Sequence, residues 1–405
     1  MDLDNIAQQR ATQYENMLRL IGRQRAPSEE AAPALAATRM RSVVNCDRIA
    51  EAYRADAKVA YVSEQFPTEI VFAAGVLPWN IESMSNMLAQ SLDIDQVFRL
   101  TQERELSRDI CSFLRGPFGM MLAECYPRPN FVLTNDQPCE GLLKTIFMSG
   151  KRYGVPTFAL HTPNLLDQDA LDYLVQQIEI MLTRIAGVFQ SDPDPECLRS
   201  SIVNSNRARE YYRKAALLLE RHALPGVARE LLEIFGMNYF GAPENIDLCK
   251  TLYEEAVVLA ETTAPKRPRV MWIGQTPGDS DELLRHLGRS VDVLYWAPLW
   301  EANLMALDEE QPLRSIAERA IRYHWNAERM ECDLDHITDA YQVEGYIIAN
   351  TWGCRNMMAI GPTFRSLAAR KRIKNLTISI DPVDRNNYAF PHIKNRVDAF
   401  LETLQ

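Results

Sequence analysis

The sequence predicts an α/β protein in which two Rossmann-like or flavodoxin-like parallel-sheet domains are joined by helices. Short apolar runs alternate with helical patterns in two separate parts of the chain, residues 58–165 and 266–405. This alternation is typical of parallel strands that helices cover on both faces. The stretch between the two parts is almost entirely helical, and a chain of 405 residues is long enough for two or three domains.

An N-terminal helical segment is expected over residues 1–57. Apolar residues recur at helical spacing between Ile6 and Ile21, with arginine and glutamine on the other faces. The Ala- and Pro-rich stretch from Pro27 to Ala37 predicts a linker or surface loop.

The first α/β domain is expected over residues 58–165. Its predicted strands are the apolar runs 58–63 (KVAYVS), 131–136 (FVLTND) and 157–162 (TFALHT). A helix led by Pro67 follows the first run, and one long helical stretch is expected from about residue 83 to residue 123.

A helical connecting region over residues 166–265 precedes the second α/β domain, residues 266–405. Apolar residues at i, i+3 and i+4 run through the connecting region. The two α/β units form a loose two-fold repeat, and the predicted strands of the second are 269–274 (RVMWIG), 291–296 (VDVLYW), 345–351 (GYIIANT) and 376–381 (LTISID).

Composition and charge narrow the class of protein. Hydrophobic residues make up 47% of the chain, as in a globular protein with a core, and the net charge of −10 argues against nucleic acid as the main partner. There is no apolar run of about 18 residues, and the polar N-terminus lacks a signal-peptide core, so we expect a cytoplasmic protein without a membrane partner. In that compartment its eight cysteines are expected to be thiols or metal ligands rather than disulfides.

Three of the cysteines stand where a ligand would bind. Cys139 follows the predicted strand FVLTND, and Cys354 follows GYIIANT. Ligands of open parallel sheets bind beyond the carboxyl ends of the strands, so these two thiols would face each other across a cleft between the domains. Cys111 precedes Gly116 and Pro117, which we expect to bend or end its helix and leave the thiol near a loop.

Two interpretations of these cysteines stay open on the residues alone. Three thiolates that converge from distant parts of the chain suit an iron–sulfur cluster, which needs soft ligands. Free cysteine is also among the most buried residue types and behaves as a small hydrophobe. No Cys-x-x-Cys pair is present to decide between the two.

In these segments the chain resembles the 2-hydroxyacyl-CoA dehydratase component family. The resemblance rests, in order, on YVSEQFPTEIVFAAGVLPWNIE, CSFLRGPFGMMLAE, NDQPCEG with YGVPTFALHTPN, EGYIIANTWGCRN and RVDAFLETL, and it covers the chain from about residue 41 to the end. The family also includes the cluster-bearing subunits of ATP-dependent benzoyl-CoA reductases and the double-cubane cluster proteins.

The resemblance implies a cofactor, a reaction and partners. It implies that Cys111, Cys139 and Cys354 hold one [4Fe–4S] cluster between the domains. It also implies a subunit that eliminates water from an (R)-2-hydroxyacyl-CoA through a ketyl radical, after one-electron reduction by a separate ATP-hydrolysing iron–sulfur activator. A homologous second subunit is expected as partner in a heterodimer, or a second copy in a homodimer.

Ser63 and Glu82 match positions on the substrate side of the family. Either could bond the thioester carbonyl or the hydroxyl, and Glu82 could move a proton if burial raised its pKa. Glu82 could equally be a solvated carboxylate at a helix start. Arg115 is expected either to neutralise the cluster or to form a surface ion pair.

Other segments are expected to contribute less. Cys46, Cys125, Cys197, Cys249 and Cys332 are interpreted as structural thiols, and the histidines show no metal-binding spacing. The segment WIGQTPGDSDELL lacks a phosphate-binding signature, so the chain itself is not expected to hydrolyse ATP. Family members often carry a cysteine where Gln275 and Thr276 stand, which counts against a double-cubane cluster.

Three alternatives remain open at this stage. The chain could be a subunit of a benzoyl-CoA reductase, in which the electron stays in the product. It could be a non-catalytic subunit that relays electrons or holds the shape of a complex, or a divergent member with other chemistry.

Overall fold

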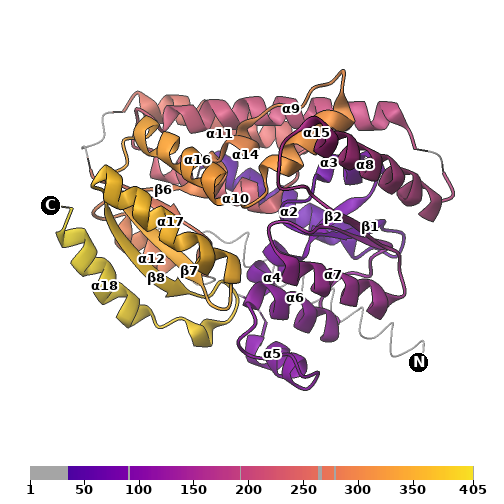
Figure 1. Cartoon of the computed structure of the whole chain (residues 1–405), viewed down its shortest axis with the longest axis horizontal. Helices are drawn as coiled ribbons and strands as arrows, with labels where there is room; N and C mark the ends of the chain where they lie inside the picture. The colour runs from indigo at the N-terminus through magenta and orange to yellow at the C-terminus, as the bar shows by residue number, and fades with distance from the viewer. Residues whose placement is uncertain (1–34, 90–91, 192, 263–266, 278–279, 405) are drawn as a thin grey trace.

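The computed structural model describes residues 35–89, 92–191, 193–262, 267–277 and 280–404. These residues form two four-stranded parallel sheets with many helices around them (Figure 1). The predicted α/β fold class with two parallel sheets is confirmed. The residue limits of the four predicted regions stay predictions, and residues 1–34, with the helix expected after Ile6 and most of the expected linker, lie outside the described residues.

The first sheet has the strand order β2-β1-β3-β4. Its strands are β1 (Val59–Val62), β2 (Leu77–Asn80), β3 (Phe131–Asn135) and β4 (Thr157–Leu160). The connecting helices are α3 (Thr68–Ala73), α4 (Ile81–Ala89), α5 (Ile94–Gln102), α6 (Ser112–Leu122) and α7 (Glu140–Tyr153). One face of the sheet packs on α4 to α7, and the other packs on apolar side chains of the later helices.

The second sheet has the equivalent order, β6-β5-β7-β8. Its strands are β5 (Arg269–Ile273), β6 (Asp292–Tyr295), β7 (Gly345–Thr351) and β8 (Lys374–Ile380). The helices around it are α12 (Ser280–Leu287), α13 (Trp296–Leu299), α14 (Glu301–Leu304), α16 (Ala327–Ala340), α17 (Arg355–Lys371) and α18 (Phe390–Glu402), with a 3-10 turn, η1 (Arg385–Asn387). From the same part of the chain, α15 (Pro312–Arg322) instead packs into the core beside the first sheet. The shared strand order is the two-fold repeat expected from the sequence.

Both sheets contain a topological switch point. The chain leaves β1 toward β2 on one side and later returns as β3 on the other, so the connections diverge between β1 and β3. The same divergence occurs between β5 and β7. A crevice opens at such a point beyond the carboxyl ends of the strands, where ligands of doubly wound folds bind.

Five further helices join the two sheet regions. They are α2 (Ala36–Ala52), α8 (Gln168–Val188), α9 (Pro195–Leu218), α10 (Pro225–Met237) and α11 (Glu244–Ala260). Figure 1 shows α9 and α11 along the top of the molecule, above both sheets. Side chains of α8 and α9 pack into the core beside the first sheet, and side chains of α9, α10 and α11 into the core of the second. No helix among the described ranges has both the length and the apolar character needed to cross a membrane.

One local expectation is wrong. The stretch from 83 to 123 is three helices rather than one, because Leu92 and Asp93 before α5 and the segment between α5 and α6 are not helical. Pro117 does not end α6 but lies inside it, and Cys111 immediately precedes this helix. The sequence analysis also missed β2, whose Pro78 is tolerated because β2 lies at the edge of the sheet, where a strand has a neighbour on one side only.

Candidate functional site

A cavity of about 1170 Å³ lies where the carboxyl ends of both sheets converge. Its wall includes residues that follow β1, β3, β5 and β7, the four strands that flank the two switch points. Residues of α2, α4 and α10 also line it, together with residues of α6, α7, α11, α13 and α17. Because the cavity joins both switch points, it is the place where this fold would bind a ligand.

Cys111, Cys139 and Cys354 all line this cavity. Each of them is the residue that immediately precedes a helix: Cys111 before α6, Cys139 before α7 and Cys354 before α17. Cys111 is buried, and the other two thiols are half-buried. Three helix N-termini therefore point their free N–H groups and positive dipole ends toward one set of thiols.

Gly353 holds the loop of Cys354 against the loop of Cys111. A Cβ atom at this position would lie 2.5 Å from the carbonyl oxygen of Asp109 and 2.6 Å from the backbone nitrogen of Cys111. The φ angle of Gly353 is +71°, which a residue with a side chain rarely adopts. The backbones of the two sheet regions thus touch beside the cysteines.

The burial of the three thiols disfavours their ionisation to thiolates. Burial raises the pKa of each of the three cysteines above its usual value, and for Cys111 the neighbouring Cys354 adds to the rise. Backbone N–H groups of the following helical turn bond to each sulfur and favour the thiolate, namely those of Phe113 for Cys111, Gly141 and Leu142 for Cys139, and Asn356 and Met357 for Cys354. A buried sulfur that accepts backbone N–H bonds suits a metal cation, because the cation takes the place of the thiol proton.

The donor set has the chemical character that an iron–sulfur cluster requires, while within the described residues no group of three or more His, Cys, Asp and Glu side chains is arranged to hold a metal ion. The thiolates of a cluster bind different irons, so their sulfurs stand farther apart than the ligands of one ion. Soft thiols at three helix N-termini are the ligand type that such a cluster needs.

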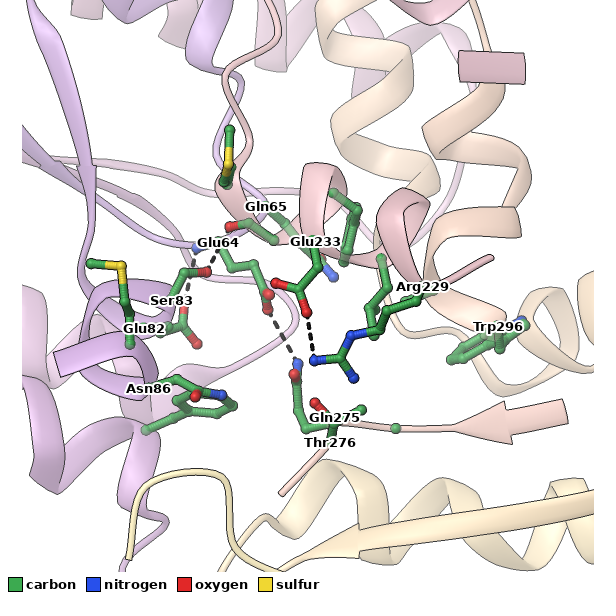
Figure 2. Close-up of a pocket in the computed structure, with 18 of the residues that line it drawn as sticks. Glu64, Gln65, Glu82, Ser83, Asn86, Arg229, Glu233, Gln275, Thr276 and Trp296 are labelled. Carbon is green, nitrogen blue, oxygen red and sulfur yellow. Dashed lines mark hydrogen bonds and ion pairs between the residues drawn. The ribbon is translucent and has the colours of Figure 1, made fainter. Parts of the chain in front are cut away.

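Glu82 and Glu64 form a carboxyl pair in the cavity wall (Figure 2). Glu82 lies in the first turn of α4, and its Oε2 accepts a hydrogen bond of 2.8 Å from the backbone N–H of Glu64, just after β1. Asn80 fixes this turn, because its Oδ1 accepts from the backbone N–H groups of Glu82 and Ser83. From the other sheet, Gln275 Nε2 donates to Glu64 Oε2 at 3.4 Å.

Burial raises the pKa of Glu64 to about 7 and that of Glu82 to about 8, and for Glu82 the nearby Glu64 carboxylate adds to the rise. Between the usual value of 4.5 and these values, the folded protein binds more protons than the unfolded chain. We therefore expect the contribution of this carboxyl pair to the free energy of unfolding to fall by several kcal/mol as the pH rises from 5 to 8. Urea denaturation at both pH values measures this fall, and Glu82→Gln should make it smaller. An equal fall in wild type and variant would contradict the assignment.

Ser63, the other predicted catalytic residue, is buried at the end of β1 and lines the cavity. Its hydroxyl donates a hydrogen bond of 2.8 Å to Oδ1 of Asn135, at the end of β3. The structure thus brings Ser63, Glu82 and the three cysteines to one cavity. Their catalytic and ligand roles stay predictions.

Arg115 corrects the expectation of a surface ion pair, and its role toward a cluster stays a prediction. Its side chain is neither on the surface nor among the residues of the cavity wall. It is fully buried, donates to Asp384 Oδ2 at 3.0 Å and to the carbonyl oxygen of Ile110, and stacks on Phe98. The arginine therefore joins α6 to the loop after β8.

The remaining cysteines and His161 lie outside the cavity wall. Cys46 and Cys249 are buried in apolar cores, and Cys197 and Cys332 are exposed. His161 is exposed and contacts Asp136 at 3.2 Å.

Sequence reasoning missed Glu64 and Asn135. Both residues sit at the carboxyl end of a strand that flanks the switch point, the same signal that pointed to Cys139. The position at the carboxyl end of a strand, which identifies Cys139, therefore marks these two polar residues as well.

The fold is a two-sheet α/β architecture, with three cysteines at helix N-terminal positions around one cavity between the sheets. Residues 64–404 match the family model described as 2-hydroxyglutaryl-CoA dehydratase, D-component. The chain belongs to this family of dehydratase components. A comparison with curated protein sequences gave no significant match. The matched range contains Glu82, Cys111, Cys139 and Cys354 and begins one residue after Ser63.

Proposed function

We propose that the protein is the iron–sulfur subunit of a 2-hydroxyacyl-CoA dehydratase, with one [4Fe–4S] cluster held by Cys111, Cys139 and Cys354. The observation that carries this proposal is the convergence of these three residues, each at a helix N-terminus, on one cavity at the switch points of both sheets. Membership in the dehydratase family supports the reaction class. The protein works in the cytoplasm, with a homologous second subunit and an ATP-hydrolysing iron–sulfur activator.

The bound cluster supplies an electron of low potential to the acyl thioester. The reaction needs this electron because the β-proton of a 2-hydroxyacyl thioester is not acidic enough for ordinary elimination. A ketyl radical at the thioester carbonyl expels the 2-hydroxyl, and the resulting radical makes the β-proton removable. The electron is recovered at the end, so the net reaction is the loss of one water.

The carboxyl pair provides the proton chemistry. The raised pKa of Glu82 keeps a proton on this side chain near neutral pH, where it can be given to the leaving hydroxyl. The backbone N–H of Glu64 holds the carboxyl group of Glu82, and the side chain of Gln275, from the second sheet region, holds the carboxyl group of Glu64. A cavity of about 1170 Å³ has room for a large thioester ligand and for a dry site around the reacting atoms.

The first test is turnover of 2-hydroxyacyl-CoA thioesters by protein purified without oxygen, with an activator, ATP and the partner subunit. Formation of an enoyl-CoA supports the proposal. A reduced acyl-CoA would instead assign the benzoyl-CoA reductase type of reaction, and activity that persists when this chain loses its cluster would assign a structural role.

Glu82→Gln should lower kcat by about 100-fold, since a group that transfers a proton contributes roughly this factor. The iron content should stay at the wild-type level, because the variant keeps the three thiols. Glu196→Gln, on the exposed side of α9, is the matched control and should keep full activity. Unchanged turnover in Glu82→Gln would remove this residue from the mechanism.

A further inference from the structure

Asn135 presents an unused hydrogen-bond donor to the cavity. Its side chain is only 2% exposed, and it lines the cavity at the end of β3. The Oδ1 atom accepts from the hydroxyl of Ser63 at 2.8 Å, whereas the Nδ2 atom has no hydrogen-bond partner among the described residues.

The neighbouring groups do not use this donor. The carboxylate of Asp136, the next residue, is engaged by His161 and by the backbone N–H of Thr162. Glu82 accepts from the backbone of Glu64, and Glu64 from Gln275. A buried N–H group without a partner costs about 1–3 kcal/mol, so its retention in a cavity wall points to an acceptor that a ligand brings.

The bond from Ser63 decides which atom of Asn135 meets the ligand. Because the hydroxyl proton of Ser63 is given to Oδ1, the amide is fixed with Nδ2 as the free end. The same bond commits the proton of Ser63, so this hydroxyl is not the donor to the substrate. A donor-only atom needs an acceptor, and in a 2-hydroxyacyl thioester the carbonyl oxygen can only accept, whereas the 2-hydroxyl can also spend its bond as a donor to another group.

We propose that Asn135 Nδ2 donates a hydrogen bond to the thioester carbonyl oxygen of the bound acyl-CoA, and that Ser63 is the residue that positions this amide. The inference rests on the proposed function and adds a substrate contact to it. Cys139 follows four residues later and lines the same cavity, so the bond places the carbonyl on the cysteine side. A fixed donor at this oxygen becomes more favourable as negative charge builds up there.

The test compares two ligands on anaerobically purified protein by isothermal titration calorimetry. One ligand is a 2-hydroxyacyl-CoA thioester, with lactoyl-CoA and 2-hydroxyglutaryl-CoA as the two examples. The other is the matching thioether, in which a methylene replaces the carbonyl and the 2-hydroxyl is kept. Asn135→Asp is the main variant, because it keeps an acceptor for Ser63 and replaces the donor with a carboxyl oxygen; the thioether measures the effect of the added carboxyl on ligand binding in general.

For Asn135→Asp, we expect the Kd of the thioester to rise about tenfold and the Kd of the thioether to stay within about twofold of wild type. Ser63→Ala should raise the thioester Kd about threefold, again without an effect on the thioether. If Asn135→Asp does not fold, Asn135→Ser takes its place in the test, with the same expected changes in the two Kd values. Equal losses for both ligands, or no loss for either, would overturn the role of Asn135 and leave the proposed function standing. Wild-type protein that binds neither thioester would overturn the proposed function itself.

Discussion

Cys139→Ala should abolish cluster binding. We expect iron and acid-labile sulfide to fall from about four of each per chain to less than one in protein purified without oxygen, with loss of the brown colour. In the proposed site three thiols at helix N-termini would share the cluster, and the loss of one would leave two attachment points in a large cavity. No other cysteine can take the place of Cys139 as a ligand, because none of the other five cysteines lies in the cavity wall.

Cys125→Ala is the matched control for this experiment. Cys125 is a half-buried thiol that packs on the same apolar core as Cys139, but it is not part of the cavity wall. Its substitution should leave the iron content unchanged. Full iron content in Cys139→Ala would contradict the ligand assignment, and loss of iron in Cys125→Ala would move a ligand to that position. About eight irons per wild-type chain would point to a double-cubane cluster despite Gln275.

Glu69→Ala should lower the free energy of unfolding by about 3–5 kcal/mol, the cost of leaving buried charges without their partner. Glu69 is fully buried on α3, and its carboxylate accepts from Arg319 on α15 and from Ser205 on α9, each at 2.6 Å. Arg209 lies 3.9 Å away as a second cation. Burial alone would raise the pKa of Glu69, but the two guanidinium groups lower it below its usual value. Urea denaturation at pH 7 measures the loss.

The control for Glu69 is an exposed ion pair. Glu210 pairs with Lys214 one turn away on α9, and water surrounds both side chains. Glu210→Ala should change the free energy of unfolding by about 0.5 kcal/mol or less. Equal effects of the two substitutions would mean that the buried cluster contributes no more than a surface pair.

The sequence was sufficient for those features that depend on local pattern. Seven of the eight described strands coincide with the predicted runs. The central strands are largely apolar because both of their faces are buried, whereas β4 and β8 lie at sheet edges and are partly exposed. The position of Cys139 and Cys354 at the cavity followed from one general rule, since both come directly after a strand of a parallel sheet.

Features that depend on tertiary packing could not be predicted in the same way. β2 is four residues long and contains Pro78, and only its pairing with β1 identifies it as a strand. Glu82 at the start of a helix is compatible with a solvated carboxylate, and its burial depends on the other elements that enclose the cavity. Arg115 meets Asp384, which lies 269 positions later in the chain.

The three cysteines are divided unequally between the two halves of the molecule. Cys111 and Cys139 belong to the first sheet region and Cys354 to the second, and Gly353 is where the two backbones come into contact. A rotation of one sheet region against the other therefore changes the separation of Cys354 from the other two sulfurs. A residue larger than glycine at position 353 would clash with the backbone of Asp109 and Cys111 and would separate the two regions beside these thiols. If the three thiols hold the proposed cluster, its attachment would therefore depend on how the two sheet regions are aligned.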